Sequence, residues 1–269
     1  MAEATKSDQG TAVGEEVAAR LAALNQTTPV SGVAGPGRWL VAEYQPTALF
    51  SLKISSATSS VGKSLVVPTL YTIKMALVDA GFRAGISDAE CADLLRSLVE
   101  VDVRIGVTAV AAVTHTFVKV RQESRGADPL RPYISTIAYR EVVHHHGRWL
   151  WAFDLVCGDD TLAERLVRLA PHVSYVGKRG SFVQFQGLSR ATQLNDQFTQ
   201  PVQNDKPWSP PARAHVVSLD DFGPEADLAT LSSYTDRSPK RDRHRKFVET
   251  IVPMGMVNTG PGFSEYRAE

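Results

Sequence analysis

The order of strand-like and helix-like segments between residues 37 and 190 constrains the fold of this chain more than any other feature. Strand-like segments are rich in Val, Thr, Ile and aromatic residues, and helix-like segments carry apolar residues every three to four positions. The expected elements are a strand at Ala48–Ser55, helices opening at Pro68 and Ser87, strands at Val110–Gln122, Tyr133–Val143 and Trp149–Val156, a helix from Thr161, and a strand-loop-strand segment ending at Phe185. With one insertion removed, the order is βαββαβ, which predicts an α+β fold with a ferredoxin-like, RRM-like domain.

Local sequence signals mark the ends of the first two helices. Pro68-Thr69 precedes an apolar face of Leu70, Ile73, Leu77 and Ala80. We expect Gly81 to end this helix, because glycine readily adopts the left-handed backbone that often follows a helix. Ser87 and Glu90 form a capping box, in which both side chains bond to free backbone N–H groups at the start of the second helix.

Three regions are expected along the chain. Residues 1–36 form an N-terminal arm with one possible helix, because Val13, Val17, Leu21 and Leu24 recur at helical spacing. Residues 37–190 form the ferredoxin-like domain, with an inserted hairpin at about 120–140. Residues 191–269 are rich in Pro and Asn and form a β-rich C-terminal extension, with strands near 214–219 and 247–253.

Composition indicates a globular protein that stays in the cytoplasm. The chain has 269 residues and is 43 % hydrophobic, which is enough for a substantial core. No apolar stretch is long enough to cross a membrane, and the N-terminus lacks the order of a signal peptide. Cys91 and Cys157 have no metal-ligand spacing, so we expect buried thiols, no metal and no cofactor.

Charge is balanced over the whole chain and concentrated locally. Lys plus Arg and Asp plus Glu number 29 each, so no net field draws in a polyanion. This balance argues against a free-standing nucleic-acid binder and is compatible with a subunit of an assembly. Six cations fall within residues 237–246, where a solvated loop and a phosphate contact are both open.

The segment Gly177-Lys178-Arg179-Gly180-Ser181 carries the most functional information. Two glycines let the backbone turn tightly and expose N–H groups to phosphate oxygens, and the two cations between them neutralise phosphate charge. The segment follows the second helix of the βαββαβ order, beside the strand that returns to the sheet.

Three segments resemble the Cas-five family of the RAMP superfamily, found in CRISPR systems. Tyr175–Gln184 resembles the glycine-rich loop of that family, and Pro68–Leu77 resembles its entry into the first helix. Arg245–Pro253 through Gly262–Tyr266 resembles its C-terminal strand and closing aromatic segment. The resemblance spans roughly residues 46–267.

The resemblance implies a palm made of one ferredoxin-like domain, with a β-hairpin thumb inserted into it. Such a protein is a non-catalytic subunit of a type I Cascade-like effector complex. It holds the 5′ handle of the guide RNA, contacts the backbone and large subunits, and meets target DNA only indirectly. Single-stranded RNA in such a grip is held by phosphate neutralisation and by base stacking.

On this basis, we predict an RNA-binding set in the palm and the thumb. The palm residues are Gly177, Lys178, Arg179, Gly180, Ser181, Lys53, Lys74 and Arg140. The thumb supplies Arg121, Arg125 and Arg131 as cations, and the candidate stacking groups are Tyr133 and Tyr139.

Two enzymatic alternatives remain open. Some relatives in the superfamily cut precursor RNA without metal, and His144, His146 and Tyr139, with His115, supply acid–base groups for that reaction. Ala57-Thr-Ser-Ser-Val-Gly62-Lys63-Ser64 fits a relaxed P-loop pattern for an ATPase. Its first glycine is replaced by Ala57, and Pro68 interrupts the helix that must follow.

Overall fold

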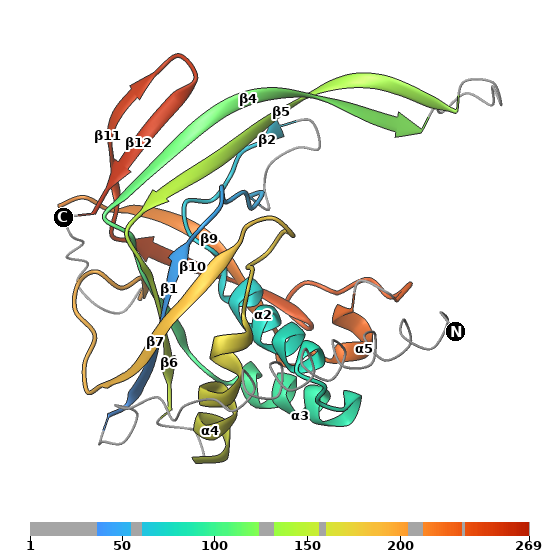
Figure 1. The fold of residues 1–269 in the computed structure, drawn as a ribbon, viewed down its shortest axis with the longest axis vertical. Helices are drawn as coiled ribbons and strands as arrows, with labels where there is room; N and C mark the ends of the chain where they lie inside the picture. The colour runs from blue at the N-terminus through green and yellow to red at the C-terminus, as the bar shows by residue number, and fades with distance from the viewer. Residues whose placement is uncertain are drawn as a thin grey trace, which may run out of the picture.

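The computed structural model of the chain describes residues 37–54, 61–123, 132–155, 160–203, 212–232 and 235–268. The expected N-terminal arm, residues 1–36, therefore lies outside the described residues. Three antiparallel-rich sheets and a layer of helices make up the described structure (Figure 1).

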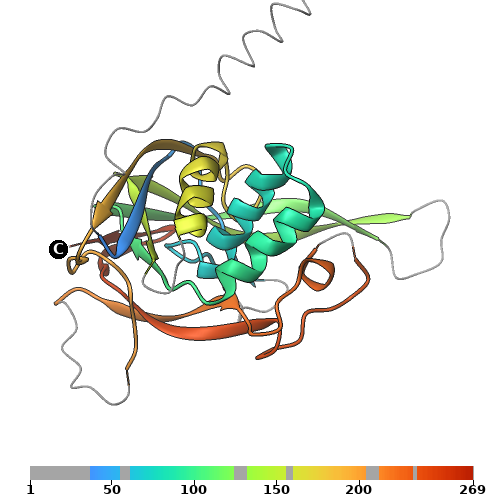
Figure 2. The same ribbon diagram turned by 90° about the horizontal axis from the view of Figure 1, so that it is seen from below.

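The first sheet has four antiparallel strands in the order β3-β6-β1-β7. These are β1 (Trp39–Pro46), β3 (Val103–Gly106), β6 (Trp149–Asp154) and β7 (Val183–Ala191). Helices α2 (Leu70–Arg83) and α3 (Asp88–Val99) connect β1 to β3, and α4 (Asp160–Leu169) with the short 3₁₀-helix η1 (Ala170–His172) connects β6 to β7. The helices lie on one side of this sheet (Figures 1 and 2). The chain order is βαββαβ, with the first and third strands, β1 and β6, at the centre of the sheet and the last, β7, at its edge beside β1. The predicted α+β, ferredoxin-like fold is therefore confirmed.

The first core strand lies earlier than predicted. It is Trp39–Pro46, and of the predicted Ala48–Ser55 only single bridges at Phe50 and Lys53 form. The run from Trp39 to Ala42 is buried and continuously apolar, as expected for a central strand. Pro46 is tolerated because it is the last residue of the strand and pairs only with β7, at Val183.

The helix signals were correct at the N-termini and wrong at one C-terminus. Ser87 and Glu90 form the predicted capping box, and Thr69 caps α2 through the backbone N–H of Thr72. Gly81 does not end α2, which continues to Arg83, and Gly85 takes the left-handed backbone at φ 77°. Gly81 instead allows a close helix contact, because an added Cβ would lie 3.1 Å from the Cys91 sulfur.

A long hairpin is inserted between β3 and β6. Its strands are β4 (Val110–Glu123) and β5 (Tyr133–His146), and its outer half projects from the rest of the molecule (Figure 1). The hairpin expected at about 120–140 overlaps these strands at residues 120–123 and 133–140. Short strand β2 (Val61–Gly62) pairs with β5, and β12 (Phe263–Arg267) and β11 (Gly255–Gly260) add to β4.

The third sheet lies within the C-terminal extension. Its order is β8-β10-β9, with β8 at Gln200–Pro201, β9 at His215–Phe222 and β10 at Arg245–Val252. A single turn of helix, α5 (Leu228–Leu231), follows β9. The sheet packs against α2, where the buried Lys74 ammonium lies 2.7 Å from the Asp221 carboxylate.

The main core lies between the first sheet and its helices. Leu40, Ile73, Leu77, Leu95 and Trp151 are all fully buried there. A smaller apolar cluster covers the opposite face of the sheet, where Phe198 packs on Trp39, Val41 and Ala152. The Phe198 segment also extends the sheet beyond β3, because the Thr199 N–H donates to the Ile105 carbonyl at 2.9 Å.

Candidate nucleic-acid interface

The glycine-rich loop is a tight turn between η1 and β7. Gly177 and Gly180 have φ values of 72° and 103°, in the left-handed region that side chains other than glycine rarely occupy. The Ser181 N–H donates to the Lys178 carbonyl at 3.1 Å, which closes the turn. Lys178 and Arg179 are exposed at its tip.

The loop is fixed to the segment that follows β1. Gly177 lies so close to Leu52 that an added Cβ would be 3.3 Å from its Cδ1. The Ser51 N–H donates to the Ser181 hydroxyl at 3.5 Å, and the Ser51 hydroxyl donates to the Glu141 carbonyl on β5 at 3.0 Å. Ser181 is buried, so its hydroxyl supports the loop, and its assignment as an RNA contact is corrected.

Three of the predicted phosphate ligands lie together at this point. Partial desolvation lowers the pKa of Lys178, and the positive charges of Arg140 and Lys53 lower it further. The Arg140 guanidinium curls onto its own strand and donates to the Tyr139 carbonyl at 3.0 Å. None of these three cations forms an ion pair with an acidic side chain in the described part of the chain. The arrangement is a concentrated positive site beside exposed loop backbone, which suits an anion.

Lys74 is not available to a phosphate, and its assignment is corrected. The side chain is fully buried between α2 and the third sheet, paired with Asp221 and 5.6 Å from the Phe222 ring centre. Burial lowers the pKa of Lys74, and the Asp221 carboxylate opposes that shift. In the sequence, Lys74 falls between the apolar positions Ile73 and Leu77 of α2. Strand β9 of the third sheet covers the side of the helix that carries Lys74.

The remaining predicted RNA-binding residues belong to the outer hairpin. Tyr133 and Arg121 are exposed on β5 and β4. Arg125 and Arg131 lie outside the described residues. Tyr139, nearer the base of the hairpin, contacts the rings of Phe117 and His115 at centroid distances of 5.5 Å and 5.6 Å.

A buried carboxylate organises polar groups next to the positive site. Glu141 accepts the Ser64 N–H at 2.8 Å and the Tyr139 hydroxyl at 3.4 Å, and its Oε1 lies 3.6 Å from the His115 Nε2. Desolvation, followed by the charge of Glu141, raises the pKa of Tyr139. The role of Glu141 was not predicted. The contact between Glu141 and His115 follows from the register of the hairpin, which pairs these two residues across the strands.

The histidines proposed for catalysis do not converge on Tyr139, and this set is corrected. Alternate residues of a strand point to opposite faces, so His144 and His146 face away from Tyr139 and Glu141. Both are exposed, whereas His145 between them is buried. Tyr139 shares its face with His115 instead.

The segment proposed as a P-loop has a different structure where it is described. Residues 57–60 lie outside the described residues, and Lys63 and Ser64 follow β2 as extended chain. Ser64 donates its N–H to Glu141, and α2 begins only at Leu70. In a P-loop the Lys and Ser open the helix, so we do not propose ATP hydrolysis.

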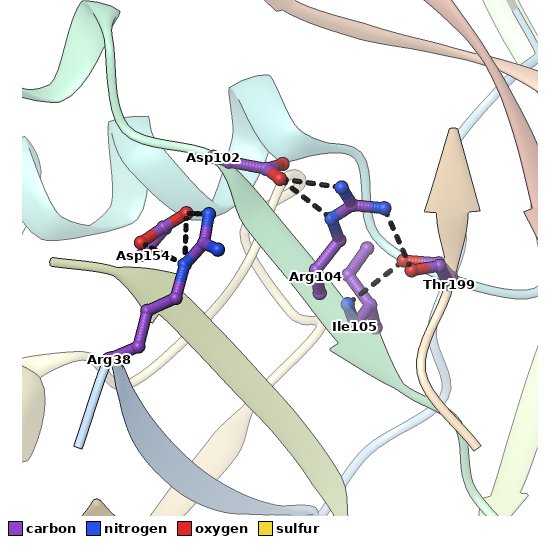
Figure 3. Close-up of polar contacts among 6 residues, drawn as sticks. All are labelled: Arg38, Asp102, Arg104, Ile105, Asp154 and Thr199. Carbon is purple, nitrogen blue, oxygen red and sulfur yellow. Dashed lines mark hydrogen bonds and ion pairs between the residues drawn. The ribbon is translucent and has the colours of Figure 1, made fainter. Parts of the chain in front are cut away.

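A separate cavity of about 340 Å³ lies beside β3 and the start of β1. Its two arginines are held by neighbouring groups (Figure 3). Arg38 forms hydrogen bonds to both Asp154 oxygens, and Arg104 donates to Asp102 and to the Thr199 carbonyl. These pairs neutralise the arginines, so the cavity lacks the excess positive charge of the loop site.

The described residues contain neither a candidate metal site nor a candidate membrane span. No three His, Cys, Asp or Glu side chains are grouped there as metal ligands. No helix in those ranges has the length and apolar character needed to cross a membrane.

Comparison with known proteins gives little further information. No protein-family model matches the chain, and no curated protein is significantly similar to it. One solved structure with some similarity is a CRISPR protein from Archaeoglobus fulgidus. It has a TM-score of 0.45 and 11 % sequence identity over 86 % of this chain and 92 % of that chain. A TM-score below 0.5 does not establish a common fold, so the fold assignment above rests on the strand order.

Proposed function

We propose that this protein binds the 5′ handle of a CRISPR guide RNA as a non-catalytic subunit of a Cascade-like complex. The observation that carries the proposal is the meeting of Lys53, Arg140 and Lys178 beside the glycine-rich loop. These residues come from three distant parts of the chain. The chain segments that resemble the Cas-five family include this loop, and they supply the CRISPR context.

The chain has no net charge, so we attribute its RNA binding to positive charge that is concentrated locally. Lys178 lies near two cations and forms no ion pair with an acidic side chain of the described residues, which costs electrostatic energy in the unbound protein. A phosphate removes that repulsion. In the proposed assembly, the backbone and large subunits contact this protein, and target DNA is bound by the complex rather than by this chain.

Binding of a labelled repeat-derived RNA at several salt concentrations tests the proposal. We expect Lys178→Ala/Arg179→Ala to weaken binding and to reduce the slope of log affinity against log salt by about 1.4, the value for two phosphate contacts on a single strand. Arg96→Ala/Arg168→Ala is the charge-matched control, because both arginines are exposed on α3 and α4. Unchanged binding by the loop variant, or no binding by the wild type with partner subunits present, would contradict the proposal.

One observation favours a second candidate function, metal-independent cleavage of precursor RNA. His115 and Tyr139 flank Glu141 beside the positive site, and a base and a proton donor are what such cleavage needs. The same assay separates the candidates when RNA length is followed in EDTA. Shortened RNA that disappears in His115→Ala identifies a nuclease, whereas intact RNA supports the binding subunit.

A further inference from the structure

One face of the hairpin, called here the inner face, carries Val113 and Phe117 of β4 and Val143 and Tyr139 of β5. Its burial changes along the length of the hairpin. Near the base, Val113 and Val143 on this face are buried in the main core. Further out the same face leaves the core and remains apolar, with Phe117 72 %, Ile137 69 % and Tyr133 58 % exposed. Apolar groups that protrude so far on a two-stranded ribbon indicate a bound partner.

Cross-strand pairing places cations among these apolar groups. Phe117 lies opposite Tyr139, Lys119 opposite Ile137, and Arg121 opposite Ser135. Residues of one face repeat at about 6.8 Å along a strand. Two cations, Lys119 and Arg121, therefore lie on this face between the Phe117–Tyr139 pair and Tyr133, which pairs with Glu123. Rings and cations on one face suit a strand with planar bases and a charged backbone better than the core of a protein interface, where Lys is depleted.

This face adjoins the positive site at the edge of β5. Glu141 on this face accepts the Ser64 N–H, and Ser64 pairs with Lys53, whereas Arg140 points to the opposite face of the strand. Glu141 accepts the Tyr139 hydroxyl, and Tyr139 contacts the Phe117 ring edge-to-face at an angle of 68°. The Phe117 ring is thus held from one side and open on the other, as a stacking platform requires.

We propose that Phe117 stacks an unpaired base of the strand whose phosphates occupy the Lys53, Arg140 and Lys178 site. The proposal rests on the function proposed above and adds a residue and a contact to it. Stacking on the Phe117 ring contributes affinity without releasing counterions, so this contribution does not depend on salt concentration. Phosphate contacts of the loop cations release counterions, so their contribution falls as salt rises.

The test measures affinity, salt slope and base environment together. RNA carrying 2-aminopurine reports stacking, because its fluorescence falls when the base packs on an aromatic ring. We expect Phe117→Ala to weaken binding about 5- to 150-fold, the effect of one lost stack, with an unchanged salt slope and a loss of quenching at one RNA position. Phe117→Trp should keep both affinity and quenching.

Matched controls make the outcomes distinct. Ile134→Ala removes a side chain that is 50 % exposed on the opposite face of the same hairpin, and it should leave binding unchanged. An abasic nucleotide at the quenched position should lower the affinity of the wild type as much as Phe117→Ala does, and it should not lower the affinity of that variant further.

Full affinity and quenching in Phe117→Ala, beside a binding defect in Lys178→Ala/Arg179→Ala, would overturn this inference and leave the proposed function standing. Absence of RNA binding in every variant and the wild type would overturn both.

Discussion

His145 shows how burial controls a single titratable side chain in the hairpin. The ring packs between Phe50 and Trp149, and its Nδ1 lies 3.1 Å from the Thr108 hydroxyl. Burial lowers the pKa of His145 to about 3, and the charge of neighbouring His144 adds to the shift. The folded protein therefore holds this histidine neutral over a range in which an unfolded chain protonates it.

We predict that His145 makes stability fall as pH falls below about 6.5. The unfolded chain binds a proton there and the folded chain does not until the pH approaches 3, so acid favours unfolding. At pH 5, the cost is about 2 kcal/mol, because it depends only on the unfolded pKa when the folded one is much lower. Urea unfolding at pH 7.5 and 5 measures this, and His145→Phe should remove that part of the pH dependence. An equal pH dependence in both proteins would contradict the assignment.

Lys178 gives a second pH effect, this time on binding. Because desolvation and two cations lower its pKa, Lys178 loses its proton at a lower pH than an ordinary lysine. We expect affinity for a phosphate-containing strand to decline as pH rises into that range. Lys178→Arg should retain affinity to higher pH, because a guanidinium stays protonated. Hydrolysis-resistant 2′-O-methyl RNA allows the measurement, and parallel pH curves for the two proteins would exclude Lys178 from the interface.

At the scale of elements, one buried ion pair joins α2 to the third sheet. Asp221 on β9 accepts Lys74 from α2 and lies 3.7 Å from Lys246 on β10. Arg245 extends the junction, with its guanidinium 4.6 Å from the ring centre of Tyr71. The C-terminal extension is therefore anchored to the ferredoxin-like domain by charge as well as by apolar packing.

We predict unequal costs for removing the two partners of this pair. Asp221→Ala leaves the Lys74 ammonium buried without compensation and should cost about 3 kcal/mol of unfolding free energy. Lys74→Met should cost less, because Asp221 keeps Lys246 and the Phe222 N–H, and methionine fills similar space. Chemical denaturation measures both. Lys74→Met should also bind RNA like the wild type, and a binding defect in a folded Lys74→Met protein would restore Lys74 to the interface.

Elements that depend on local signals were predicted well from the sequence. The Ser87–Glu90 capping box and the β-prone composition of β4, β5 and β6 depend on residues within a few positions of one another. The first strand, predicted at Ala48–Ser55, was misplaced because Pro46 falls inside the extended segment and its tolerance was not foreseen. A proline can end a central strand when a neighbouring strand does not need its missing N–H at that position. The strand pairing that decides this is not visible in the sequence.

At the scale of the whole molecule, the candidate site was predicted in part. Gly-Lys-Arg-Gly is a local motif, so the loop was found directly, and Lys53 and Arg140 were named with it. Lys74 was misassigned because its burial depends on a sheet made from the far end of the chain. The contacts of Glu141 with His115 and of Phe117 with Tyr139 were not predicted, because they depend on the register of a hairpin with 14-residue strands.

The pairing of β12 with β4 has a consequence for how the molecule is made. Strand β4 precedes β12 by more than half of the chain, yet Phe263 to Arg267 supply one of its two neighbours. Contacts between such distant segments slow folding, because the intervening chain must be ordered before they form. During translation, the edge of β4 at residues 110–114 therefore stays unpaired until β12 leaves the ribosome, and that edge is open to mispairing and to chaperones in the interval.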